Sequence, residues 1–230
     1  MKKIVLILSM LFPSSMALAN EIYIDQSGNN LDLTVTQSGT GNVIGTSAET
    51  VILEGDDMTF DITQTGDDNI IHAVIKGNTY TGLWSFTGNS NTVDLTCDET
   101  SGVNCETVTM NITVNGDSNT FQVYLGETAD TSDLIAEWVV DGDSNAFVTN
   151  INGASVHVDI TVDNSVSMAG GNTFNIDITG DGDATGHELV LDVTGGGSTY
   201  DIDQSGNLDD NIINITQVGD NAIVTISQSN

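Results

Sequence analysis

Glycines spaced eleven residues apart constrain this chain more than any other feature. The interval separates Gly28 from Gly39, Gly66 from Gly77, Gly77 from Gly88, Gly142 from Gly153, and Gly195 from Gly206. Glycine followed by Asn or Asp supplies the positive φ angles that a tight turn between strands requires. Since eleven residues hold one strand and one turn, two such units make a repeat of about 22 residues. The predicted turn residues include Gly28, Gly39, Gly66, Gly206, Gly219, Asn42 and Asn69.

Between these glycines, apolar and polar residues alternate strictly, as they do in half-buried strands, and helical periodicity is absent beyond the first nineteen residues. The alternating segments are Leu31–Val35, Met58–Ile62, Met110–Val114, Phe121–Leu125, Val156–Val162, Phe174–Ile178 and Leu189–Val193. We therefore expect an all-β fold, a β-solenoid of strand-turn-strand repeats with roughly nine coils at about 22 residues each. The longer glycine intervals from Gly88 to Gly142 predict loop insertions in the middle, around Cys97–Cys105 and Glu127–Asp133.

Glutamine marks the end of several strands and lies on the same face as their apolar residues. Counting back from Gln217 in steps of two gives Ile215 and Ile213, so this amide is expected to point inward. A lone buried amide costs about 1–3 kcal/mol, but stacked coils let each amide bond to its neighbours in a ladder. The predicted inward glutamines, which we expect to mediate self-assembly, are Gln26, Gln37, Gln64, Gln204, Gln217 and Gln228.

The first nineteen residues have the three parts of a secretory signal. Lys2 and Lys3 precede an apolar run, Ile4–Phe12, and Ala17-Leu18-Ala19 offers a cleavage site before Asn20. Residues 1–19 are therefore expected to be removed, leaving one repeat domain over residues 20–230. Lys76 then remains as the one cation against 33 acidic residues, a net charge of −32. Such a chain lacks the clustered cations that nucleic acids and anionic membranes require.

Several segments resemble the curlin repeat, whose pattern is Ser-x5-Gln-x-Gly-x-x-Asn-x-Ala-x5-Gln. They are Leu31–Asn42, Thr59–Asn69 and Asn211–Gln228. The resemblance implies a β-solenoid subunit of curli, the amyloid fibre that Gram-negative bacteria secrete for biofilm and surface adhesion. It also implies self-association, a companion curlin subunit and a curli-type outer-membrane secretion pore. The glycine-rich segment that precedes the repeats in major curlin subunits is absent before Gln26, which leaves the export route and the choice between major and minor subunit open.

Other chemistry has little support in the sequence. Cys97 and Cys105 are expected to form a disulfide in an oxidising compartment, since two cysteines without a nearby histidine do not make a metal site. The turns at Thr179–Ala184 and Gly206–Asp210 hold carboxylates that could bind calcium, but we favour ordinary turn chemistry there. His72, His157 and His187 lie in unrelated repeats, and neither a catalytic cluster nor a metal site is expected.

Two classes of function remain after the sequence is considered. The first is a secreted structural fibre subunit that grows by templated edge addition, and it is the one we favour. The second is a monomeric β-solenoid adhesin or ligand-binding module, which needs a regular row of outward threonines. In the sequence those threonines are interrupted by Asp and Asn. A solenoid enzyme is not expected.

Overall fold

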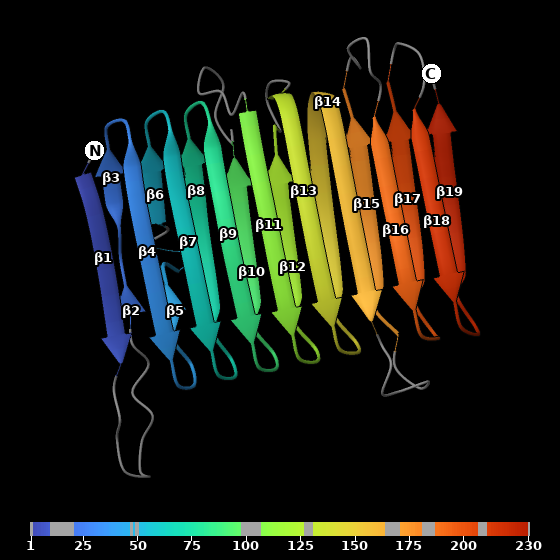
Figure 1. Cartoon of the computed structure of the whole chain (residues 1–230), viewed down its shortest axis with the longest axis horizontal. Helices are drawn as coiled ribbons and strands as arrows, with labels where there is room; N and C mark the ends of the chain where they lie inside the picture. Colours follow the sequence, from blue (N-terminus) through green and yellow to red (C-terminus); the bar gives the residue numbers. More distant parts are fainter. Residues whose placement is uncertain are drawn as a thin grey trace.

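The computed structural model is a stack of flattened coils in which two parallel β-sheets face each other (Figure 1). It describes residues 2–9, 21–46, 48, 51–97, 107–126, 131–163, 171–180, 187–206 and 211–229. The chain passes alternately through the two sheets, so that its described ends lie at opposite ends of the stack. No helix is present in those ranges, and thus none that could span a membrane.

Sheet A contains β1 (Lys2–Ser9), β4 (Leu31–Ser38), β7 (Met58–Thr65), β9 (Tyr80–Thr87), β11 (Thr107–Asn115), β13 (Thr131–Asp141), the second half of β14 (Ala146–Asp163), β16 (Glu188–Thr194) and β18 (Ile212–Val218). Sheet B contains β2 (Glu21–Ile22) with β3 (Asp25–Ser27), β5 (Val43–Ile44) with β6 (Val51–Glu54), β8 (Ile70–Lys76), β10 (Thr92–Cys97), β12 (Thr120–Leu125), the first half of β14, β15 (Thr173–Thr179), β17 (Thr199–Ser205) and β19 (Ile223–Ser229). All of these pairings are parallel.

The repeat is longer than its glycines suggest. Register partners in sheet A are 22 residues apart from Phe60 to Gly82 and from Ala136 to Val158, but 31 apart from Val158 to Leu189. Each turn of the stack has about 26 residues. The expected 22 residues per coil was therefore too short, because extra residues enter the connections between strands while the strands keep their register.

Alternation of side chains builds the core as the sequence predicts. In β4 and β7 every second residue is buried, and the buried set faces the opposite sheet. Because parallel strands stack in register about 4.8 Å apart, like residues form columns through the coils. The rings of Phe121, Phe147, Phe174 and Tyr200 make one such column, with successive centroids 4.8, 4.9 and 5.2 Å apart.

Both tryptophans lie inside this core. Trp84 is 2% and Trp138 is 1% exposed, and Trp84 Nε1 donates to the carbonyl oxygen of Phe60 at 3.2 Å. Trp84 and Phe86 lie two residues apart on the inward face of β9, and both side chains are buried. Neither ring is available as an exposed platform for a ligand.

Two elements differ from the expected strand-turn-strand pattern. Strand β14 runs continuously from sheet B into sheet A, so Gly153 lies within a strand and not at a tight turn. Asp133, expected in a loop insertion, lies in β13. Thr131 and Ser132 lie in that strand as well, and residues 98–105 and 127–130 of the two expected insertions fall outside the described ranges.

Residues of the expected secretory signal form β1, which pairs with β4 from Lys2 opposite Leu31 to Ser9 opposite Ser38. That placement leaves the predicted cleavage before Asn20 as a prediction. β1 occupies the strand position next to β4 at the N-terminal end of sheet A (Figure 1).

Candidate self-assembly ends

The glutamines gather at the two ends of the stack. In sheet A the column that contains Gln37 and Gln64 continues through Phe86, Val114, Val140, Val162 and Val193 before it ends at Gln217. In sheet B the corresponding column begins at Gln26 and ends at Gln204 and Gln228, with apolar residues between. Apolar residues thus replace the amides in the central coils of the stack.

Two pairs of glutamines bond to each other between adjacent coils. Gln64 Nε2 donates to Gln37 Oε1 at 2.7 Å, and both side chains are almost fully buried. Gln228 Nε2 donates to Gln204 Oε1 at 3.3 Å, with Gln204 only 1% exposed. The inward orientation inferred from parity therefore matches the structure at these positions. Their role in self-assembly stays a prediction.

The other two glutamines bond to backbone carbonyls. Gln217 Nε2 donates to the oxygen of Gly195 at 2.7 Å, and Gln26 Nε2 donates to the oxygen of Gly28 at 3.3 Å. Gln26 shares its register with Leu53 and Gln217 with Val193, so neither has another glutamine beside it on its described strand partner.

Asparagine forms a longer ladder that sequence reasoning missed. Asn42, Asn69, Asn91, Asn119, Asn145 and Asn172 are all buried and occupy equivalent places in successive coils. Each backbone N–H from Asn42 to Asn145 donates to the Oδ1 of the next asparagine, at 2.7–3.1 Å. Asn172 N–H donates to Ser198 Oγ at 3.2 Å. Asn42 and Asn69 were expected as turn residues, but their side chains lie in the interior and join coils.

The turn glycines are required by close backbone contact as well as by φ. Gly66 has φ +136°, and a Cβ there would meet the backbone of Gly39. Gly28, Gly39 and Gly219 also have positive φ, as the sequence predicts for a turn. Gly206, also expected as a turn residue, has no such φ. Asn three residues after the glycine accompanies the turns at Gly39, Gly66, Gly88, Gly116 and Gly142, whereas the turns at Gly28 and Gly219 lack that Asn.

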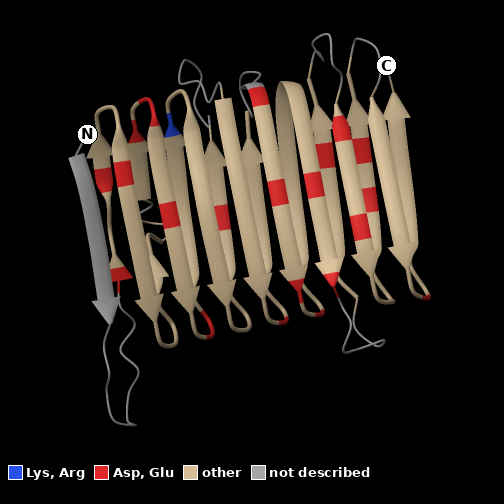
Figure 2. Ribbon diagram, in the orientation of Figure 1, with Lys and Arg blue, Asp and Glu red and all other residues tan. Residues whose placement is uncertain are grey.

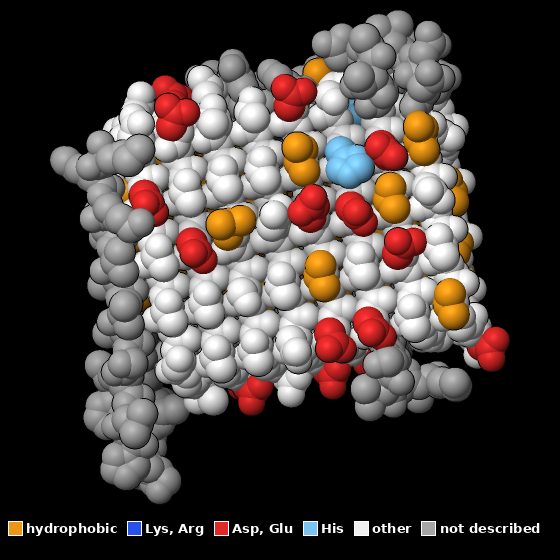
Figure 3. All heavy atoms as spheres, viewed as in Figure 1, with side chains coloured by type: hydrophobic (Ala, Val, Ile, Leu, Met, Phe, Trp, Pro, Cys, Tyr) orange, Lys and Arg blue, Asp and Glu red, His pale blue; other side chains and the backbone are white. Residues whose placement is uncertain are grey.

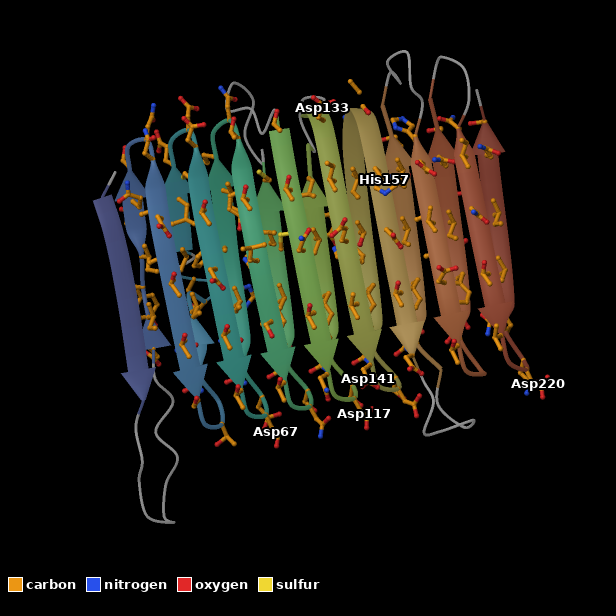
Figure 4. The ribbon with its side chains drawn as sticks, in the orientation of Figure 1. Asp67, Asp117, Asp133, Asp141, His157 and Asp220 are labelled. Carbon is orange, nitrogen blue, oxygen red and sulfur yellow. The ribbon has the colours of Figure 1, made fainter. Side chains whose placement is uncertain are left out.

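Acidic side chains in the same turns also join the coils. Asp67 Oδ1 accepts from Asn89 N–H at 2.7 Å, and Asp117 Oδ1 accepts from Asp143 N–H at 2.7 Å. Figure 4 labels Asp67 and Asp117 among the turns along one edge of the stack. Asp and Asn at these positions therefore serve as acceptors between coils, in addition to favouring the turn conformation.

The C-terminal coil is open. The inward-facing Val224 and Ile226 of β19 are 43% and 48% exposed, whereas their register partners Tyr200 and Ile202 on β17 are fully buried. Ile213 and Ile215 of β18 are only partly buried. Among the described residues no strand pairs with the outer edges of β18 and β19. Apolar side chains and unpaired backbone groups thus meet solvent together.

Among the charged residues that the structure describes, carboxylates far outnumber Lys and Arg (Figure 2). Figure 3 shows several carboxylates scattered among neutral side chains on one face. His157, labelled in Figure 4, has its Nδ1 3.1 Å from Glu188 Oε2, and two residues further along the strands Glu137 and Asp159 are register partners. On sheet B, Asp177 pairs with Asp203, and burial together with that second carboxylate raises the pKa of Asp177. Parallel stacking therefore brings like charges together.

The structure describes only part of the expected disulfide and of the acidic turns considered for calcium. Cys97 is fully buried at the end of β10 and is disulfide-bonded. Cys105, residues 181–186 and residues 207–210 lie outside the described ranges. Within those ranges no group of three or more His, Cys, Asp and Glu side chains could hold a metal ion.

These features define a parallel β-solenoid whose coils are joined by ladders of amides. The family model described as curlin associated repeat matches residues 28–66, the segment from the first turn glycine through β7. This match supports the curlin-repeat family, a structural and not an enzymatic one. No curated protein and no solved structure matches the chain.

Proposed function

We propose that the chain is a secreted structural subunit that self-assembles into curli-like extracellular amyloid fibres, which contribute to biofilm matrix and surface adhesion in a Gram-negative bacterium. The open C-terminal coil carries this proposal. It exposes Val224 and Ile226 at positions that are buried in every internal coil, and its strand edges have unsatisfied backbone groups. Addition of another coil buries these two side chains and pairs the unsatisfied backbone groups.

The glutamine side chains at the two ends of the stack support addition of one copy of the chain to another. Gln217 and Gln228 lie on the last strands, and Gln26 and Gln37 on the first strands of the repeat domain. Inside the stack the pairs Gln37–Gln64 and Gln204–Gln228 show that two such amides in adjacent coils bond to each other. A companion curlin subunit with the same amides, and a curli-type pore for export, are the partners that this function needs.

The test uses purified chain beginning at Asn20, incubated in moderate salt and followed by electron microscopy and thioflavin fluorescence. Wild type is expected to form fibres. Ile226→Asn places an amide on the exposed inward face of β19 and is expected to slow fibre growth severely. Thr225→Asn makes the same kind of change on the outward face and serves as the matched control. A wild-type chain that stays monomeric contradicts the proposal.

A second candidate, the monomeric binding module, gains support from one feature. In sheet A the outward column Thr36, Thr63, Ser85 and Thr113 carries a hydroxyl in four successive coils. The column then meets Val139 and Asp192, so the array covers only part of the face. Persistent monomers that bind a polysaccharide surface would favour this function over fibre formation.

A further inference from the structure

Without β1, sheet B begins one strand position before sheet A. In sheet B the first strands are β2 and β3, which stack on β5 and β6. In sheet A the next strand after β1 is β4, which follows β2–β3 along the chain. If the expected signal is removed, one strand position beside β4 becomes vacant while the corresponding position in sheet B stays occupied by residues 21–27.

At the other end of the stack the last coil is complete. It has β18 in sheet A and β19 in sheet B, each of seven residues. A second copy that docks this coil on the first one can place β18 beside β4, where β1 lies here. Its β19 then reaches the position that β2–β3 already holds, because β19 follows β18 by half a coil.

We propose that fibre growth proceeds by exchange of a half-coil: β18 of an incoming copy pairs with β4, and β19 displaces β2–β3 from β5–β6. This inference rests on the proposed self-assembly and names the surface and the register through which one copy receives another. The resident half-coil, which consists of β2 and β3, thus leaves its place in sheet B when another copy adds.

The resident half-coil is held weakly. Strands β2 and β3 have two and three residues, and of the segment 21–27 only Ile22 is buried. Three backbone hydrogen bonds beyond the regular ladder tie this region to β5–β6, from Gly45, Ile52 and Gly28. Tyr23 is 47% exposed. Replacement by the longer β19 adds paired residues without removing a well-packed element.

The incoming coil matches the surface that it would cover. By the register of the columns, Ile213 and Ile215 fall over Leu33 and Val35, and Gln217 falls over Gln37. In β1 the residues at these three positions are Ile4, Leu6 and Leu8, so β4 already accepts a parallel strand with the same alternation. In sheet B, Val224 falls over Ile44, the place that Ile22 occupies here.

A reversible cross-link tests the exchange. Glu21 and Val43 are register partners whose side chains face outward, and strands about 4.8 Å apart are within the range of a disulfide. In the chain from Asn20, Glu21→Cys with Val43→Cys pins β2 to β5 when oxidised. We expect fibre elongation from preformed wild-type seeds to slow by about tenfold or more, a barrier change of about 1.4 kcal/mol, and to recover after reduction.

Controls separate the possible failures. Wild type with and without reductant accounts for any effect on the native disulfide of Cys97. A second variant, Ile22→Asn, loosens the half-coil and is expected to speed elongation. If the oxidised double-cysteine chain elongates as fast as its reduced form, or Ile22→Asn slows elongation, the exchange is overturned while the fibre function stands. If wild type itself does not polymerise, the proposed function falls, and the exchange falls with it.

Discussion

Gln64 and Gln37 form a hydrogen bond of 2.7 Å between two almost fully buried amides in adjacent coils. The same column is apolar from Phe86 to Val193, so this interior position accepts either amide or apolar side chains when the adjacent coils carry the same kind. An amide without its partner is the unfavourable case, because a buried polar group that loses its bond costs about 1–3 kcal/mol.

Gln64→Met is therefore expected to lower the free energy of unfolding by about 1–3 kcal/mol, since it leaves Gln37 Oε1 without this donor. Adding Gln37→Met should recover part of the loss, because both partners are then apolar. Urea unfolding of the two single variants and the double variant measures the coupling. Strictly additive losses would show that the pair does not act as a unit.

Gly88→Ala is expected to destabilise the chain far more than Gly41→Ala. At Gly88 φ is +130° and a Cβ would lie 2.1 Å from the carbonyl oxygen of Gly66. At Gly41 φ is +66° and nothing lies within 4 Å of the added Cβ, so only conformational strain of roughly 1–2 kcal/mol applies. Thermal unfolding compares them, and equal losses would mean that backbone contact between turns is unimportant.

The asparagine ladder predicts that two substitutions at Asn119 differ in their cost. Asn119 Oδ1 accepts from Asn91 N–H at 2.8 Å, so Asn119→Ala leaves a buried N–H unpaired at a cost of about 1–3 kcal/mol. Asn119→Ser should be milder, because Ser198 accepts from Asn172 at the equivalent place. Hydrogen exchange of the Asn91 amide gives a local readout. Identical exchange in both variants would contradict the ladder's role.

Stability should rise on mild acidification because of Asp177. Burial and the neighbouring Asp203 raise the pKa of Asp177 above its ordinary value. A carboxyl whose pKa is raised in the folded state destabilises that state when ionised, and the penalty disappears as pH falls from neutral through the raised pKa. Asp177→Asn is expected to stabilise the chain at neutral pH and to flatten this dependence. Asp192→Asn, whose register partners are Thr161 and Thr216, is the control.

The same crowding of carboxylates predicts a dependence of assembly on salt. The chain from Asn20 carries a net charge of −32, and each added subunit brings equivalent acidic positions close together. Fibre growth is expected to be slow at low ionic strength and faster with added salt, because screening shortens the range of the repulsion. Polymerisation in EDTA at low salt, at the rate seen in high salt, would contradict this expectation.

The sequence alone predicted which side chains of each strand face inward, because successive side chains point to opposite faces of a strand and only one face is buried. It also located tight turns such as those at Gly66 and Gly88, where the backbone leaves no room for a Cβ, but not the continuous strand through Gly153. It could not give the length of each coil: register survives insertions of any length in the connections, as the 31 residues between Val158 and Leu189 show. Nor could it tell that Asn69 joins coils, because turns and ladders favour the same residue.

The openness of the last coil has a consequence for how an isolated subunit behaves in solution. In a linear array each coil is stabilised chiefly by its nearest neighbours, so a coil with one neighbour melts before a coil with two. Amide protection should therefore decline gradually from the aromatic column at Phe147 toward β19, where Val224 and Ile226 have no covering layer. In the free monomer β18 and β19 are then less protected than the centre, and a fibre protects them by adding the covering coil that the monomer lacks.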